Sequence, residues 1–239
     1  MKKLRILTFI LLLFVGCKDT KGNALKILTE TEDSSDRYSF ESDVSSERIK
    51  ELKDQINNWQ NLVDQKVEAT ANIGYYYKLL GGTYFENEMY GPSLEAFQKA
   101  INIYPDNSIL HFKAAVSSAK IAKSLPSNSS LEYFKLSEEY YKKAIQRNPQ
   151  YGEALYGLSI LYIFELSTPL EAIPLVDKLM SIREYNMEAL FLRARLYVIT
   201  GDIEKAVDIY DQIIKTSKNS DKREQAQQNK KILLEKWNG

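Results

Sequence analysis

Apolar residues recur at intervals of three and four along most of this chain, beginning near residue 46. The first run places Ile49, Leu52, Ile56 and Trp59 on one face of a helix, which is predicted to extend from about residue 46 to about residue 67. No later segment alternates between apolar and polar residues with period two, so strands are not expected. The pattern therefore predicts an all-α fold.

The helical pattern also repeats, with small residues at fixed positions. When Gly74 is counted as position 1, Gly81, Ser93 and Ala100 stand at positions 8, 20 and 27 among large apolar residues. Corresponding residues follow three more times: Ala115, Ser137 and Ala144, then Ser159, Ala172 and Leu179, then Ala194, Ala206 and Ile213. This pattern resembles the tetratricopeptide repeat, a helix-turn-helix unit of 34 residues whose small residues let two helices approach closely.

The resemblance implies a right-handed α-solenoid of about four repeats, with an N-terminal helix and a C-terminal capping helix. The expected boundaries are 45–73 for the N-terminal helix, 74–218 for the repeats (74–107, 108–151, 152–186 and 187–218) and 219–239 for the cap.

Three features of the repeats depart from the usual pattern. Pro105 and Pro149 are 44 residues apart, ten more than one repeat, and the surplus is predicted to be a turn-rich stretch at 124–130. A kink is expected at Pro174, because proline removes a backbone donor. Arg193 stands where the family usually has leucine.

The resemblance also implies a site for a partner. Tetratricopeptide arrays bind through first-helix side chains on the concave side of the superhelix, and the corresponding residues here are largely apolar and aromatic: Tyr75, Lys78, Phe112, Val116, Tyr156, Ile160, Phe191 and Arg195. Gly82 stands where members that grip a carboxylate have asparagine, so that mode of binding is not expected. An exposed apolar groove needs a cover, either a segment of a partner protein or the N-terminal helix with Trp59.

Residues 1–16 have the composition of a secretory signal peptide, with a basic start and an apolar stretch from Ile6 to Val15. The stretch is too short to span a bilayer, which takes about 20 apolar residues. The Gly16-Cys17 junction resembles the lipobox of bacterial lipoproteins, although Phe14 and Val15 depart from its usual form. The resemblance implies cleavage before Cys17 and acyl chains, such as palmitate, that hold the mature protein on a membrane. Residues 17–44, rich in serine and acidic side chains, are predicted to form a flexible tether.

Composition and motifs exclude several classes of function. The 32 basic side chains balance 32 acidic ones, so the excess of positive charge that nucleic-acid binding needs is missing. His111 is the only histidine and Cys17 the only cysteine, so no zinc site and no internal disulfide are expected. No catalytic constellation is recognisable, and neither an enzyme nor a cofactor or metal is expected.

The sequence is therefore interpreted as a lipoprotein of a bacterial cell envelope that faces the periplasm or the exterior. We expect a non-catalytic adaptor that binds another protein through its concave groove. One alternative is an accessory subunit of a periplasmic solute-binding or transport system, or a ligand-binding tetratricopeptide protein. A closed pocket lined by Phe112, Tyr156 and Phe191 would favour this alternative. A second alternative is a subunit that assembles outer-membrane proteins.

Overall fold

The structure, a computed structural model, describes residues 46–182 and 186–237, with the backbone alone at positions 127 and 128. All regular elements in this part are helical: α2 (Ser46–Glu86), α3 (Tyr90–Ile103), α4 (Ser108–Ser124), α5 (Ser127–Arg147), α6 (Gly152–Ile160), η1 (Leu161–Glu165), η2 (Pro169–Ala172), α7 (Ile173–Met180), α8 (Asn186–Thr200), α9 (Ile203–Thr216) and α10 (Ser220–Trp237). The all-α prediction is confirmed. The predicted signal peptide, Cys17 and the tether at 17–44 lie outside the described residues.

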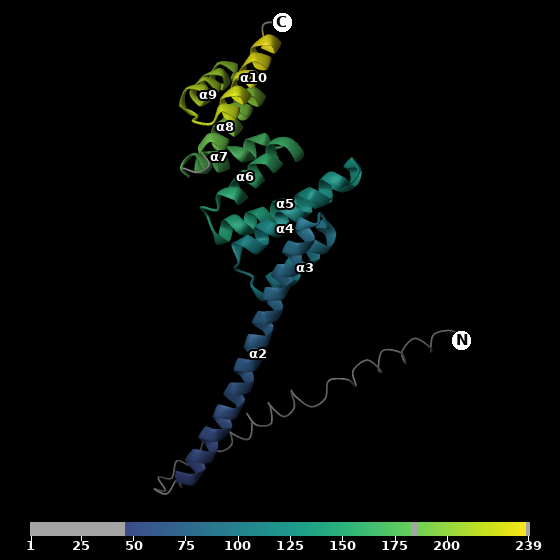
Figure 1. The fold of residues 1–239 in the computed structure, drawn as a ribbon, viewed down its shortest axis with the longest axis vertical. Coiled ribbons are helices and arrows are strands. Elements are labelled where there is room, and N and C mark those ends of the chain that lie inside the picture. The colour runs from purple at the N-terminus through teal and green to yellow at the C-terminus, as the bar shows by residue number, and fades with distance from the viewer. Residues whose placement is uncertain (1–45, 183–185, 238–239) are drawn as a thin grey trace, which may run out of the picture. The chain divides into compact units, whose positions relative to one another are not determined.

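The chain divides into two compact units after Asn61. In the second unit, helices α3 to α10 stack one after another, each packed against the next (Figure 1). This succession of helical hairpins is the predicted solenoid. The core is correspondingly continuous along the stack, and its buried clusters join neighbouring hairpins rather than forming one central nucleus.

Helix α2 runs without a break from Ser46 to Glu86, so the prediction of a separate helix ending near residue 67 is wrong. The expected boundary between residues 73 and 74 falls inside this helix. The segment Glu68-Ala69-Thr70-Ala71 contains neither proline nor glycine, and therefore has no residue that would stop a helix. In the first unit, the apolar side chains of the predicted face are exposed, and Trp59 retains 69% of its accessible surface.

Small residues bring α2 and α3 together as the repeat pattern predicts. A β-carbon at Gly81 would stand 2.8 Å from two ring carbons of the buried Phe97, so this position has room only for a hydrogen atom. Ser93 is fully buried and its hydroxyl donates to the carbonyl of Gly81 at 2.9 Å. The same hydroxyl lies 3.1 Å from that of Ser117 in α4, which links the first hairpin to the second.

The second hairpin accommodates its additional residues as helix rather than as loop. Only Leu125 and Pro126 separate α4, which has 17 residues, from α5, which has 21, so the prediction of a turn-rich stretch at 124–130 is wrong. Proline ends α4, because the residue before a proline avoids the helical conformation. Helix α5 begins directly after this proline, which occupies its N-cap position without a side-chain hydrogen bond.

The third hairpin is the least regular. Its first helix, α6, continues as the π-helical turn η1, and its second begins with the 3₁₀ turn η2 before α7. Pro174 therefore lies in the first turn of α7 instead of kinking a longer helix, which corrects the prediction. A proline in the first turn breaks no hydrogen bond, because that N–H has no partner within the helix.

Polar contacts tie the third hairpin to its neighbours. The hydroxyl of Tyr162 in η1 donates to Glu138 of α5 at 2.8 Å, and Lys142 donates to the same carboxylate at 2.6 Å. Partial burial raises the pKa of Glu138, but these two hydrogen bonds together with the positive charges of Lys142 and Lys135 outweigh it and hold the pKa below its ordinary value. On the other side, Arg193 of α8 forms an ion pair with Asp177 of α7. The arginine that replaces the usual leucine thus joins two hairpins.

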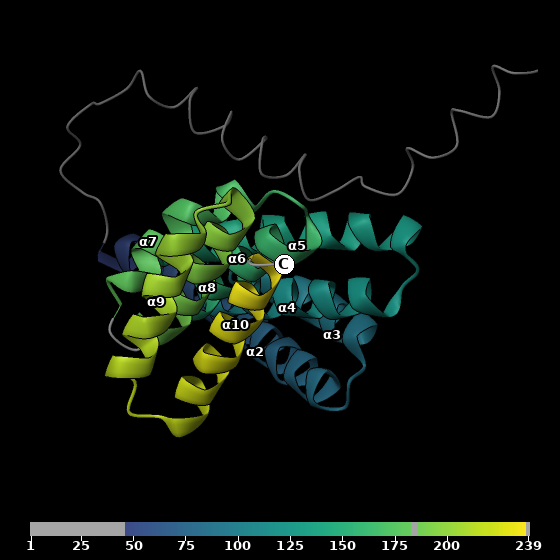
Figure 2. The same cartoon turned by 90° about the horizontal axis from the view of Figure 1, so that it is seen from above.

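Helix α9 packs against both α8 and α10 (Figure 2). Its buried residues Tyr210 and Ile213 form a cluster with Leu190 and Ala194 of α8. Helix α10 contributes the fully buried Ala226 to the same cluster, and so closes the end of this core. This is the role that the sequence predicts for a capping helix.

Candidate binding groove

Two adjoining cavities open along the second compact unit. The first, of about 400 Å³, is lined by residues of α4, α5, α6 and η1, and the second, of about 540 Å³, by residues of α6, η1, α8, α9 and α10. Tyr156 and Ile160 of α6 line both cavities, so the two adjoin at these side chains. We refer to the two cavities together as the groove.

The first cavity is mainly apolar. Phe112 of α4 packs with its ring centroid 5.2 Å from that of Tyr151 and 6.1 Å from that of Tyr141. Tyr141 reaches the cavity over Gly157, where a β-carbon would stand 2.6 Å from its ring, and burial raises the pKa of the Tyr141 hydroxyl. An ion pair of 2.9 Å between Lys123 and Glu165 lies among the lining residues. The surface thus offers aromatic contacts with little net charge.

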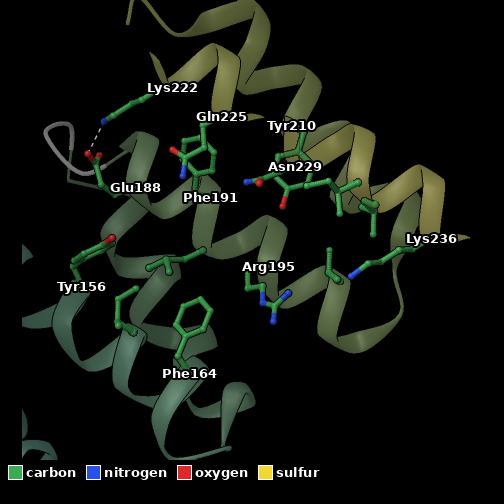
Figure 3. A pocket seen from close by; sticks show the side chains of 15 residues that line it. Tyr156, Phe164, Glu188, Phe191, Arg195, Tyr210, Lys222, Gln225, Asn229 and Lys236 are labelled. Carbon is green, nitrogen blue, oxygen red and sulfur yellow. Dashed lines mark hydrogen bonds and ion pairs between the residues drawn. The ribbon is translucent and has the colours of Figure 1, made fainter. Parts of the chain in front are cut away.

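The second cavity combines aromatic, amide and charged groups (Figure 3). The guanidinium of Arg195 lies over the ring of Phe164, 5.7 Å from its centroid. At another point of the wall, Lys222 of α10 donates to Glu188 of α8 at 2.6 Å. Burial, together with the nearby Glu188 carboxylate, raises the pKa of Tyr156, and burial likewise raises that of Tyr210. These tyrosines are therefore neutral groups that can donate or accept hydrogen bonds.

The π-helical turn η1 shapes the boundary between the cavities. Phe164 lines the second cavity, whereas Leu161 and Glu165 line the first. A π turn accommodates one more residue than an α-helical turn, and such turns occur frequently at functional sites. Here the wider turn places Phe164 in the second cavity and its neighbour Glu165 in the first.

Six of the eight residues predicted to bind a partner line the groove. Phe112 and Val116 line the first cavity, Phe191 and Arg195 the second, and Tyr156 and Ile160 both. Tyr75 and Lys78 of α2 line neither cavity. Tyr75 instead packs edge-on against Tyr76, with ring centroids 5.5 Å apart, and half of its surface is exposed.

Sequence reasoning missed the contribution of α10. It was expected only to cover the end of the solenoid, yet it supplies six of the lining residues of the second cavity: Lys222, Gln225, Asn229, Ile232, Leu233 and Lys236. Positions 222, 225, 229, 232, 233 and 236 recur at the three- and four-residue spacing of an α-helix, which places their side chains on one face of α10. That spacing was readable in the sequence, but its mixture of polar and apolar side chains resembles an ordinary solvated face.

The structure places His111 as a packing residue of the second hairpin. It is 4% exposed, and its Nε2 lies 2.8 Å from the carbonyl of Pro105. Among the described residues, no group of three or more histidine, cysteine, aspartate or glutamate side chains is arranged to hold a metal ion. No helix in 46–182 or 186–237 combines the length and hydropathy of a membrane-spanning segment.

Stacked helical hairpins with a lateral groove define the chain as an α-solenoid repeat protein. A tetratricopeptide repeat model matches residues 71–107, 127–151 and 188–220. A "TPR repeat-containing protein" of Borreliella burgdorferi (strain ATCC 35210 / DSM 4680 / CIP 102532 / B31) is 30% identical over 227 residues, which cover 92% of this chain and 96% of that protein. The chain belongs to the tetratricopeptide repeat family. The family model does not match 152–187, the hairpin that contains the π and 3₁₀ turns.

Solved structures show the same fold at lower sequence identity. The protein TTC0263 of Thermus thermophilus is 15% identical, with a TM-score of 0.54 over 74% of this chain and 95% of its own. YrrB, described as "a TPR protein with an unusual peptide-binding site", is 18% identical, with a TM-score of 0.54 over 85% of this chain and 97% of its own.

Proposed function

We propose that this protein is a non-catalytic adaptor that binds a segment of another protein in the groove. The observation that carries the proposal is that the two cavities adjoin at Tyr156 and Ile160, so that together they extend over a longer surface than either cavity alone. Aromatic side chains with few rotatable bonds supply contact area at a small entropic cost, and they are enriched at protein interfaces. The description of YrrB as a peptide-binding protein supports a similar use of this fold.

The arrangement favours a groove over an enclosed ligand pocket. Phe112, Tyr156 and Phe191 do not line one common cavity, because Phe112 lines the first, Phe191 the second and Tyr156 both. A small molecule would contact only part of this surface, whereas an extended or helical peptide could follow it along three hairpins.

The proposal is tested by crosslinking in living cells, with a photoreactive amino acid at Val116. We expect a discrete adduct with one partner protein. Phe112→Glu and Tyr156→Glu should each abolish the adduct, because each buries a charge against apolar contacts. Leu170→Glu is the control for an added charge: this leucine is apolar but exposed, and it lines neither cavity, whereas Phe112 and Tyr156 are half-buried in the groove. Adducts that survive both groove substitutions, in variants with unchanged circular dichroism, would refute binding in the groove.

We further propose that the mature protein is anchored to a membrane of the cell envelope through a lipid on Cys17. The Gly16-Cys17 junction and the preceding apolar stretch support this. Two or more acyl chains together give stable anchoring and confine the groove to one surface, which raises the effective concentration of a partner there. Mass spectrometry of the mature N-terminus should find an acylated Cys17, and Cys17→Ser should release the protein from the membrane fraction. An unmodified thiol would exclude this anchor and leave the proposed groove untouched.

A further inference from the structure

The second cavity differs from the first in its electrostatics. Its lining includes three cationic side chains, Arg195, Lys222 and Lys236, and one acidic side chain, Glu188. The ion pair of 2.6 Å between Lys222 and Glu188 neutralises one of these cations. Two positive charges, on Arg195 and Lys236, therefore remain at the wall of the second cavity.

Within the described part of the chain, no carboxylate lies at ion-pair distance from Arg195 or Lys236. Arg195 approaches from α8 and Lys236 from the last turn of α10 (Figure 3). The guanidinium carbon of Arg195 lies 5.7 Å from the centroid of the Phe164 ring. A guanidinium can bind a carboxylate through two parallel hydrogen bonds.

Hydrogen-bonding and apolar side chains line the same cavity as Arg195 and Lys236. Gln225 and Asn229 lie one turn apart on the same face of α10, and their amides can both donate and accept. Phe164, Phe191 and Val198 provide apolar surface in the same cavity. The complementary ligand therefore carries a carboxylate next to an apolar side chain.

We propose that the second cavity binds an acidic side chain, aspartate or glutamate, of the partner's segment, with Arg195 and Lys236 as its counter-charges. A neighbouring apolar side chain of the same segment packs against Phe164 and Phe191. This assignment rests on the proposed adaptor function and names the chemistry of the partner. It also makes α10 a wall of the binding site in addition to a cap on the core.

The test is selection of random peptides displayed on phage against the immobilised full chain. The peptides are fused to the phage coat at their C-termini, so that only side-chain carboxylates are available. We expect enrichment of sequences in which aspartate or glutamate adjoins a large apolar residue. Arg195→Gln and Lys236→Gln should each weaken binding of the selected peptides by about fivefold, as expected for one exposed charge pair.

Lys231→Gln is the matched control, because it removes one exposed charge from the same helix without touching the second cavity. Equal weakening by Lys231→Gln would assign the effect to overall charge and overturn the inference. Enriched apolar peptides without acidic residues, sensitive to Tyr156→Glu but not to Arg195→Gln, would also overturn it and leave the adaptor function standing. Failure to enrich any peptide would count against both proposals.

Discussion

The close approach of α2 and α3 predicts opposite effects for the same substitution at two neighbouring glycines. Gly81 and Gly82 both lie inside helix α2. A β-carbon at Gly81 would stand 2.8 Å from two ring carbons of Phe97, whereas at Gly82 no heavy atom lies within 4 Å. Phe97 is 2% exposed and has no free volume into which it could move.

Replacing glycine by alanine inside a helix raises stability by roughly 1 kcal/mol through the lower entropy of the unfolded chain. Gly82→Ala should show this gain in full. Gly81→Ala receives the same gain but also overpacks the interface with Phe97, which costs about 1–3 kcal/mol. The helix-propensity contribution is common to both variants, so the difference between them measures the overpacking alone.

Urea unfolding followed by circular dichroism measures both variants against the parent protein. We expect Gly82→Ala to raise the urea midpoint and Gly81→Ala to fall below Gly82→Ala by about 1–3 kcal/mol in free energy of unfolding. Amide exchange in α2 and α3 should accelerate only in Gly81→Ala. Equal stabilisation by the two substitutions would show that α3 does not approach α2 as described, and would refute the account of the repeat interface.

Three further substitutions probe contacts between hairpins. Ser93→Ala should lower the free energy of unfolding by about 1 kcal/mol, because the carbonyl of Gly81 and the hydroxyl of Ser117 lose a buried hydrogen-bond partner. An unchanged urea midpoint would contradict this. Arg193→Leu should leave the free energy of unfolding unchanged or raise it by up to about 1 kcal/mol. An apolar residue can replace the arginine of this ion pair because its partner Asp177 stays hydrated. A marked loss of stability would show that the ion pair is essential. Glu138 has a folded-state pKa below its unfolded value, so its contribution is present above the unfolded pKa and is lost as the pH falls below about 4.5 and through the folded pKa. Glu138→Gln should therefore destabilise at neutral pH but much less at strongly acidic pH, and a pH-independent effect in urea titrations would refute this sign.

Much of the groove could be predicted because the solenoid repeats a single local unit. Gly81, Ser93 and Ala100 define the register of one repeat, and the register of the next repeat follows from it. The register also shows which face of each first helix points away from the second helix of the same hairpin. Phe112, Val116 and Phe191 could be assigned to the groove in this way. Tyr75 and Lys78 occupy corresponding positions in the first repeat but line neither cavity. The repeat register does not determine which side chains of other helices lie close enough to form a cavity with them.

The sequence by itself determined the helical class, the number of hairpins and the closely packed positions, because these depend on spacing within about 34 residues. Only the tertiary structure decided how the helices end and which surfaces meet. Helix α2 continues past residue 67 because no residue there stops it, whereas the helical residues after Pro126 and the π turn that contains Phe164 depend on packing that outweighs local turn propensity. The charge of the second cavity was likewise not readable from the sequence. It arises because α10 and α8 line the same cavity, with Lys236 from α10, Arg195 from α8 and Lys222 paired to Glu188, and these residues are far apart along the chain.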